Sequence, residues 1–264
     1  MDLKLAGKTA LVSGSTGGIG LAIAQSLAQE GAAVIINGRS QERVNQAIDK
    51  IKAATPDATL TGVALDLSTR EGADQLFQQR PTVNILVNNL GIYEPKAFGD
   101  IADKDWLKIF EANVLSGIRL SRQYLPTMLE HDWGRIIFIS SESAVQIPVE
   151  MIHYGMTKTA QLAIARGLAE MTVGTGVTVN SVLPGPTRSE GVGDFVAKMA
   201  SDRGVDVAQI EKEFFESVRP SSLIKRFATV EEVAALVTYV SSPLSSATNG
   251  AALRVDGGVV RSIL

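Results

Sequence analysis

The chain contains no cysteine and only two histidines, His131 and His153, among its 264 residues. Without cysteine it has no disulfide, thiolate metal ligand or thiol nucleophile, and two histidines so far apart argue against a zinc site, so we expect no bound metal. It also lacks the run of about 18 apolar residues that a transmembrane helix requires. Its first residues lack the long apolar core of a signal peptide. We therefore expect a cytoplasmic protein that does not associate with membranes.

Neither sign of charge dominates, because 25 basic and 28 acidic residues leave a net charge of −3. Such a chain has no basic surface of the strength that nucleic acid or an anionic membrane binds, so we expect neither partner. Aromatic residues contribute only 5%, but 45% of all residues are hydrophobic and 20% are charged, as in ordinary globular proteins. The length, and a sequence free of repeats, low-complexity tracts and linkers, predict one domain over residues 1–264.

Glycine is concentrated after the first strand-like run. An apolar run at 9–13 leads into the segment from Gly14 to Gly20, a helical pattern that ends at Gly31, and a second apolar run at 32–37. Glycines at a strand-to-helix turn let the backbone approach a pyrophosphate, whose charge the helix N-terminus stabilises. The spacing differs from G-x-G-x-x-G, and the alternative is a glycine-rich turn with a structural role only. The flanking strand, helix and strand favour a dinucleotide site.

The rest of the chain keeps alternating between strand-like and helical patterns. Helices are expected at 41–54, 69–79, 103–129, 153–171 and 229–241, and strands at 59–67, 83–89, 135–139, 177–183 and 251–255. This alternation predicts an α/β fold, a Rossmann-type doubly wound parallel sheet of seven strands flanked by helices. Residues 187–226 form a long insertion with two helical patterns, where a substrate lid would lie. The alternative is a helix pair that only packs.

The end of the second predicted strand bears on which dinucleotide binds. A carboxylate there binds the adenosine ribose, whereas an Arg accommodates the 2′-phosphate of NADP. The residues here are Asn37, Gly38, Arg39 and Ser40, with no acid. Arg39 is permanently charged and suits phosphate, so NADP(H) is preferred and NAD(H) remains possible. The alternatives are that Arg39 is a solvated loop cation and that Ser40 only caps the next helix.

The stretch from Ser141 to Lys158 carries the residues best suited to proton transfer. Tyr154 and Lys158 stand four apart in a helical pattern, so they share one face of the helix. A phenol has an ordinary pKa of about 10, and an ammonium beside it lowers that pKa toward the working pH. Ser141, at the end of a strand, can offer its hydroxyl to the same reacting oxygen. Taken alone, the Tyr-x-x-x-Lys pair fits an ordinary helix surface better than an active site.

Two other polar residues stand where the pattern does not require them. Asn113 lies in the middle of the predicted helix 103–129, although Asn is a poor helix former unless its side chain has a role. It could hold a water on a proton path, or be an ordinary polar position on a partly buried helix. Asp66 ends the third predicted strand, where it could bind an adenine amino group or cap the next helix.

In their order along the chain, these motifs resemble the short-chain dehydrogenase/reductase family, in its single-domain branch of roughly 250 residues. The family's Thr-Gly-x-x-x-Gly-x-Gly reads here as Ser13 to Gly20, its Asn-Asn-Ala-Gly as Asn88 to Gly91, and its Tyr-x-x-x-Lys as Tyr154 to Lys158. Its catalytic Asn and Ser match Asn113 and Ser141, and its Pro-Gly turn matches Pro184 and Gly185. The resemblance spans nearly the whole chain.

The resemblance implies a role for each matching residue. Tyr154 would be the general acid in reduction, Lys158 would lower its pKa and bind the nicotinamide ribose, Ser141 would polarise the substrate oxygen, and Asn113 would hold a proton-relay water. The residues expected to bind the cofactor are Gly14, Ser15, Thr16, Gly18, Ile19, Gly20, Arg39, Asp66, Leu67, Asn89, Gly91, Tyr154, Lys158, Pro184, Gly185 and Thr187. The chain departs from the family pattern in three ways: Leu90 replaces a small Ala, Thr187 and Ser189 follow the Pro-Gly turn, and Gly17 stands where many NADP-dependent members carry a basic residue.

The main hypothesis is an NADP(H)-dependent oxidoreductase that interconverts a small-molecule carbonyl and a secondary alcohol. One alternative is an NAD-dependent alcohol or sugar dehydrogenase. Another is a dinucleotide-sensing protein without turnover, against which the complete set of four catalytic matches argues. The resemblance also implies a homo-oligomer, a tetramer, with the helices near 103–129 and 154–171 at its interfaces.

Overall fold

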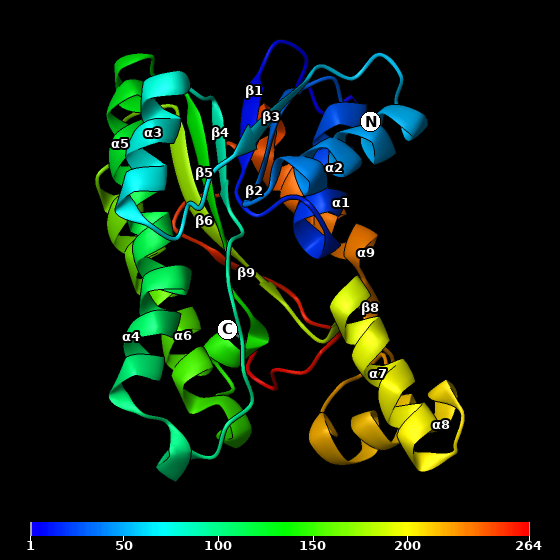
Figure 1. Ribbon diagram of the computed structural model, residues 1–264. Helices are drawn as coiled ribbons and strands as arrows, with labels where there is room; N and C mark the ends of the chain where they lie inside the picture. Colours follow the sequence, from blue (N-terminus) through cyan, green and yellow to red (C-terminus); the bar gives the residue numbers. More distant parts are fainter. Residues whose placement is uncertain (1, 264) are drawn as a thin grey trace.

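A parallel sheet of seven strands forms the centre of the computed structural model, which describes residues 2–263 (Figure 1). Its order is β3-β2-β1-β4-β5-β6-β9, and all six pairings are parallel. The strands are β1 (Thr9–Val12), β2 (Ala33–Gly38), β3 (Leu60–Ala64), β4 (Ile85–Asn88), β5 (Gly134–Ile139), β6 (Val177–Pro184) and β9 (Ala252–Val255). The predicted doubly wound sheet of seven strands is confirmed.

The strand order reverses at β1, which pairs with β2 on one side and with β4 on the other. The chain builds outward to β3 in one direction, then returns and builds outward through β4, β5, β6 and β9 in the other. In open α/β sheets, ligands bind in the crevice at the carboxyl ends of the strands beside such a reversal. Gly14 follows β1 and Asn89 follows β4, so the topology brings these two predicted residues to one crevice.

Helices cover both faces of the sheet (Figure 1). One face carries α1 (Gly18–Gln29), α2 (Gln41–Ala54) and α9 (Val230–Ser241), and the other carries α3 (Arg70–Gln79), α5 (Ser116–Glu130) and α6 (Ile152–Glu170). Because both faces are covered, a central strand such as β4 is buried at every residue, and its Ile85, Leu86 and Val87 are a continuous apolar run. Within residues 2–263, no helix is long and apolar enough to cross a membrane.

The helix predicted at 103–129 is interrupted in the structure. It consists of α4 (Asp103–Phe110), a π-helical turn at Glu111–Leu115, and α5. The wider turn contains Asn113, whose buried side chain is directed away from the helix axis to backbone groups of the loop after β4. Turns of this kind are frequent at functional sites. The strand predicted at 59–67 is also shorter than expected and ends at Ala64, since the carboxylate of Asp66 accepts hydrogen bonds that form a turn.

Residues 187–229 form a separate helical segment beside the sheet, seen in yellow and light orange in Figure 1. Two short strands, β7 (Thr187–Arg188) and β8 (Ala228–Thr229), pair at its base. Between them lie α7 (Glu190–Arg203), α8 (Val207–Glu213) and a π-helical turn at Phe214–Val218. The segment has a hydrophobic core of its own, which consists of Val196, Ala200, Ile210, Phe215 and Phe227. Its two predicted helices are therefore confirmed.

Candidate active site

The glycine-rich turn after β1 is shaped by close backbone packing. Gly14 and Gly18 have φ of +63° and +55°, a conformation that other L-residues rarely adopt. At Gly20 a Cβ would collide with Asn89 Nδ2 and with the Gly14 carbonyl oxygen. The same Asn89 Nδ2 donates to the carbonyls of Ser13 (3.0 Å) and Gly14 (3.1 Å). Asn89 therefore joins the turn after β1 to the end of β4.

Ser15 and Asn37 hold this turn in place from the protein interior. Ser15 is fully buried, where its Oγ donates to Val12 O (2.8 Å) and accepts from Asn37 N (2.9 Å). Asn37 Oδ1 in turn accepts from Gly14 N (3.0 Å). Ser15 thus shapes the turn rather than facing a ligand, whereas Thr16, Gly17 and Gly18 line the crevice.

The crevice has a volume of about 850 Å³, within the range for small-molecule and cofactor sites. Seven of the residues predicted to bind the cofactor line it: Gly14, Thr16, Gly18, Arg39, Asp66, Asn89 and Gly91. Leu67 does not, because its side chain is fully buried in the hydrophobic core, and its neighbours Leu65 and Ser68 line the crevice instead. Asp66 does not cap α3, since Thr69 accepts the capping hydrogen bond from Gly72 N.

Arg43 is a lining residue that sequence reasoning missed. Ser40 caps α2 by accepting from Arg43 N (3.3 Å), so Arg43 lies in the first helical turn next to the exposed Arg39. Its guanidinium reaches the glycine-rich turn, where a Cβ at Gly17 would lie 3.6 Å from Arg43 Nη2. A basic residue therefore reaches this turn from α2 although Gly17 itself carries none. The feature of the sequence that could have identified Arg43 is its spacing of four residues from Arg39.

A second cavity, of about 220 Å³, adjoins the crevice and shares Asn89, Gly91, Ile92 and Tyr93 with it. Its other lining residues include seven predicted ones: Ile19, Ser141, Tyr154, Lys158, Pro184, Gly185 and Thr187. The structure thus brings three of the four predicted catalytic residues, together with the Pro-Gly turn after β6, to the end of the crevice.

Tyr154 is half-buried at the small cavity, and the partial removal of its phenol from water raises the pKa above the ordinary value. The charge of Arg219 acts in the opposite direction, whereas the charge of Glu142 raises the pKa further. Tyr93 packs edge-on against the ring, with centroids 6.2 Å apart. In this structure the phenol therefore holds its proton, which is the form that donates.

Lys158 lies beneath this ring, with Nζ 5.6 Å from the ring centroid. Burial lowers the pKa of its ammonium to about 8. Nζ donates to the carbonyl of Ile139 (2.8 Å) and to Oε1 of Gln161 (3.3 Å). The expected lowering of the Tyr154 pKa by Lys158 is outweighed here, because burial disfavours the charged form of both groups.

Asn113 is a fully used buried amide rather than an ordinary polar position. Its Nδ2 donates to Ile92 O (2.9 Å) and to Thr157 Oγ1 (3.0 Å), and its Oδ1 accepts from Ile92 N (2.7 Å). The side chain therefore holds the loop after β4 against α6. The backbone carbonyl of Asn113 accepts from Gln161 Nε2 (2.6 Å).

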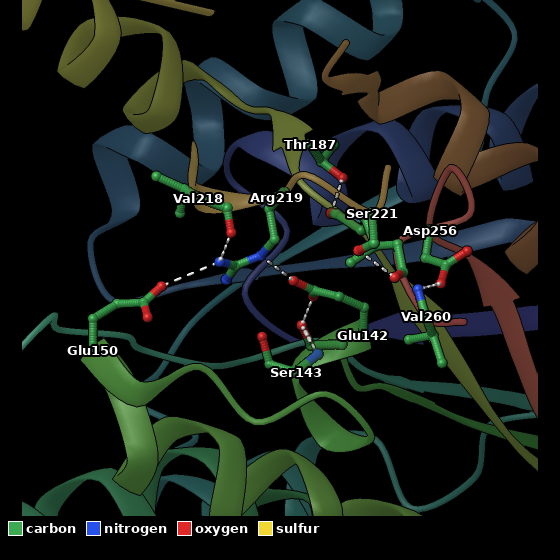
Figure 2. A network of polar contacts seen from close by, with 12 residues as sticks. Glu142, Ser143, Glu150, Thr187, Val218, Arg219, Ser221, Asp256 and Val260 are labelled. Carbon is green, nitrogen blue, oxygen red and sulfur yellow. Dashed lines mark hydrogen bonds and ion pairs between the residues drawn. The ribbon is translucent and has the colours of Figure 1, made fainter. Parts of the chain in front are cut away.

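Glu142 and Arg219 form a buried ion pair next to Ser141, shown in Figure 2. Arg219 Nε is 3.2 Å from Glu142 Oε1, and the two side chains are only 11% and 6% exposed. Ser141 Oγ donates a hydrogen bond to Glu142 Oε2 (2.5 Å). This bond uses the single hydrogen that the hydroxyl can donate. Arg219 Nη1 also lies 3.2 Å from Glu150, which is more exposed. Sequence reasoning did not find Arg219, which lies 77 residues from Glu142 along the chain.

The two cavities suit a dinucleotide. The left-handed glycines leave backbone at the start of α1 uncovered by side chains, and a Cβ at Gly91 would stand 3.5 Å from both Asn113 Oδ1 and Lys158 Nζ. The arginines lie at one end of the crevice and the Tyr154 corner at the other. The fold and the site together define a dinucleotide-dependent oxidoreductase.

Known proteins agree with this class. Residues 8–207 match the family model for short chain dehydrogenases. The chain is 55% identical to the uncharacterized oxidoreductase YvaG of Bacillus subtilis, over 100% of both chains. It is 33% identical to D-beta-hydroxybutyrate dehydrogenase of Cupriavidus necator, over 97% of this chain and 99% of that one. Its structure superimposes on that of L-sorbose reductase from Gluconobacter frateurii, solved with NADPH and L-sorbose, with a TM-score of 0.93, 30% identity and 100% of both chains covered.

The chain belongs to the short-chain dehydrogenase/reductase family. It is an NAD(P)-dependent oxidoreductase that acts on CH–OH and carbonyl groups. The family and enzyme class predicted from the motifs are confirmed.

Proposed function

We propose that this enzyme uses NADP(H) to interconvert a carbonyl compound and a secondary alcohol. The observation that carries the proposal is the junction of the two cavities, where Ser141, Tyr154 and Lys158 meet the end of a crevice that holds two arginines at its other end. The cofactor, when bound, supplies or accepts the hydride.

The side chains divide the remaining work. Tyr154 donates its phenol proton to the substrate oxygen during reduction and takes it back during oxidation. Lys158, when charged, stabilises the phenolate left behind and binds a ribose hydroxyl. Ser141 turns its hydroxyl from Glu142 to the substrate oxygen. Asn113 holds the loop after β4 in place through its hydrogen bonds with Ile92.

The preference for NADP(H) rests on Arg39 and Arg43. Both line the crevice at the end of β2, where the 2′-phosphate of NADP is bound in enzymes of this fold. Neither position offers a carboxylate to a ribose diol. Two permanently charged guanidinium groups suit a phosphate better than one, and they replace the basic residue that is missing at Gly17.

A titration of the purified protein with NADPH and with NADH, at matched salt, tests this preference. We expect NADPH to bind more tightly, and Arg39→Ala and Arg43→Ala each to weaken NADPH binding by about ten- to a hundredfold while NADH binding changes little, since a charged hydrogen bond contributes about 1.5–3 kcal/mol. Arg80→Ala, an exposed arginine far from the crevice, serves as the control. Tighter NADH binding, unaffected by both variants, would instead establish the NAD-dependent alternative.

The segment 187–229 acts, in this proposal, as the substrate lid within a single domain of residues 1–264. It supplies Thr187 to the small cavity and Arg219 to the Glu142 pair. The likeness to L-sorbose reductase supports a substrate that carries hydroxyl groups near its carbonyl. Steady-state reduction of L-sorbose compared with a simple aliphatic ketone of similar size tests this choice.

Assembly as a homotetramer remains part of the proposal. Its support is the exposed apolar side chains on the helices expected at the interfaces, such as Leu107 on α4, which is 70% exposed, and Met171 at the end of α6. Light scattering after size-exclusion chromatography would give the molar mass directly, and a mass near that of one chain would contradict the proposal.

A further inference from the structure

Gln161 lies one turn beyond Lys158 on α6 and is almost fully buried, with 1% of its surface exposed. Its Nε2 donates to the backbone carbonyl of Asn113 at 2.6 Å, and its Oε1 accepts from Lys158 Nζ at 3.3 Å. Only one orientation of the amide satisfies both bonds, because the carbonyl can only accept and the ammonium can only donate. Gln161 therefore connects two of the four predicted catalytic residues through a single side chain.

The two residues that Gln161 joins belong to different elements. Asn113 lies in the π-helical turn, while Lys158 projects from α6. The resemblance to the family implies a proton-relay water at Asn113, but in this chain a side-chain amide makes the link from that carbonyl to Lys158. An amide does not titrate near neutral pH, so it holds groups in place rather than passing protons on.

We propose that Gln161 is a positioning residue that keeps Lys158 charged and in place below Tyr154. This inference rests on the proposed carbonyl reduction at the same site. The groups that face Lys158 from β5, from the loop after β4 and from the π-helical turn are Ile139, Gly91 and Asn113, and none of these titrates.

The titratable neighbour of Lys158 on its own helix is Tyr154. The phenol of Tyr154 in turn faces the charges of Glu142 and Arg219 and the second phenol of Tyr93. These groups act on Tyr154 in wild type and in Gln161 variants alike. The acceptor at Gln161 Oε1 is therefore the contact of Lys158 that a substitution at 161 changes.

The direction of the pH effect follows from the burial of Lys158. Burial lowers its pKa to about 8, and an acceptor beside the ammonium opposes that shift. Reduction requires the charged lysine, so its kcat falls as pH rises through the pKa of Lys158. Gln161→Leu removes the acceptor and moves this fall to lower pH by about one unit, whereas Gln161→Glu places a carboxylate there and moves it to higher pH.

The test is the pH profile of kcat for NADPH-dependent reduction between pH 6 and pH 10 (about four units around the Lys158 pKa). For Gln161→Leu we expect kcat near the wild-type value at the acid end and about five- to tenfold lower between about pH 8 and 9, with the opposite displacement for Gln161→Glu. Gln78→Leu, at an exposed position on α3, is the control for the same exchange on a helix. A uniform fall of kcat at every pH in both variants would show that Gln161 only packs, and would overturn the proposal.

A second measurement does not depend on turnover. In protein labelled with [¹³Cε]lysine, the Lys158 signal, assigned through Lys158→Arg, reports its pKa by NMR titration. We expect the pKa to fall in Gln161→Leu and to rise in Gln161→Glu. Unchanged values would refute the positioning role even if the enzyme is active. If wild type reduces no carbonyl compound but these shifts are present, the proposed function fails while the contact between Gln161 and Lys158 stands.

Discussion

The sheet and the segment 187–229 are held together in different ways. Two large buried clusters pack on the two faces of the sheet, whereas the segment has a single cluster of five buried residues. The segment is joined to the rest in part by polar contacts, among them Arg219 with Glu142 and a backbone hydrogen bond from Leu223 N to Gly257 O (2.8 Å). Apolar burial over a large area fixes an element, while a few polar contacts can be exchanged for contacts to a ligand.

The sheet half and the segment also contribute different kinds of residues to the site. The residues proposed to transfer protons all project from the sheet half, at the ends of strands or on the helices that pack against it. The segment contributes Glu190 and Thr187, which line the cavities, and Arg219, which pairs with Glu142, and none of the three is required for proton transfer. Substitutions in the sheet half should therefore act mainly on turnover, and substitutions in the segment mainly on stability or cofactor binding.

The largest effect is expected on the sheet side, from Tyr154→Phe. Loss of the phenol proton should lower kcat by about two to four orders of magnitude, the usual contribution of a general acid. Cofactor binding should persist, because the ring still fills the same space. Turnover and NADPH binding measured on one preparation check both statements. Substantial remaining activity would show that another group donates the proton.

On the segment side, Arg219→Met should act mainly on stability. It leaves the Glu142 carboxylate buried without its cation, which costs about 3 kcal/mol in comparable buried pairs. Adding Glu142→Gln should restore most of the loss, because the buried charge is then gone. Urea denaturation of both variants measures this. Arg203→Met, which breaks a more exposed pair with Glu213 in the same segment, should change stability by less than about 1 kcal/mol. Equal losses of stability in Arg219→Met and Arg203→Met would show that the buried and the exposed ion pair do not differ in their contribution.

The smallest effect concerns Glu190, where the segment approaches the glycine-rich turn. A Cβ at Gly17 would lie 3.4 Å from Glu190 Oε2, so this carboxylate borders the proposed phosphate site. Its pairing with Lys50 is exposed and contributes little. Glu190→Gln should therefore tighten NADPH binding about two- to fivefold and leave the melting temperature unchanged. Weaker NADPH binding in this variant would contradict the repulsion.

The sequence by itself determined the parallel sheet, the glycine-rich turn and the family. These follow from local rules: apolar runs alternate with helical patterns, and Gly14, Gly18 and Gly20 stand where only glycine fits. The helix at 41–54 was predicted at its observed bounds for the same reason, since its cap, Ser40, is its neighbour in the chain.

Only the tertiary structure decided which polar groups meet. Arg219 reaches Glu142 across 77 residues, Gln161 reaches Asn113 across 48, and Arg43 reaches Gly17 from a different element. No periodicity records such contacts, because they depend on how separate helices and loops are packed together. The pKa of Tyr154 shows the same limit: the spacing to Lys158 predicted a lowering, but burial, which is a property of the folded molecule, raises it.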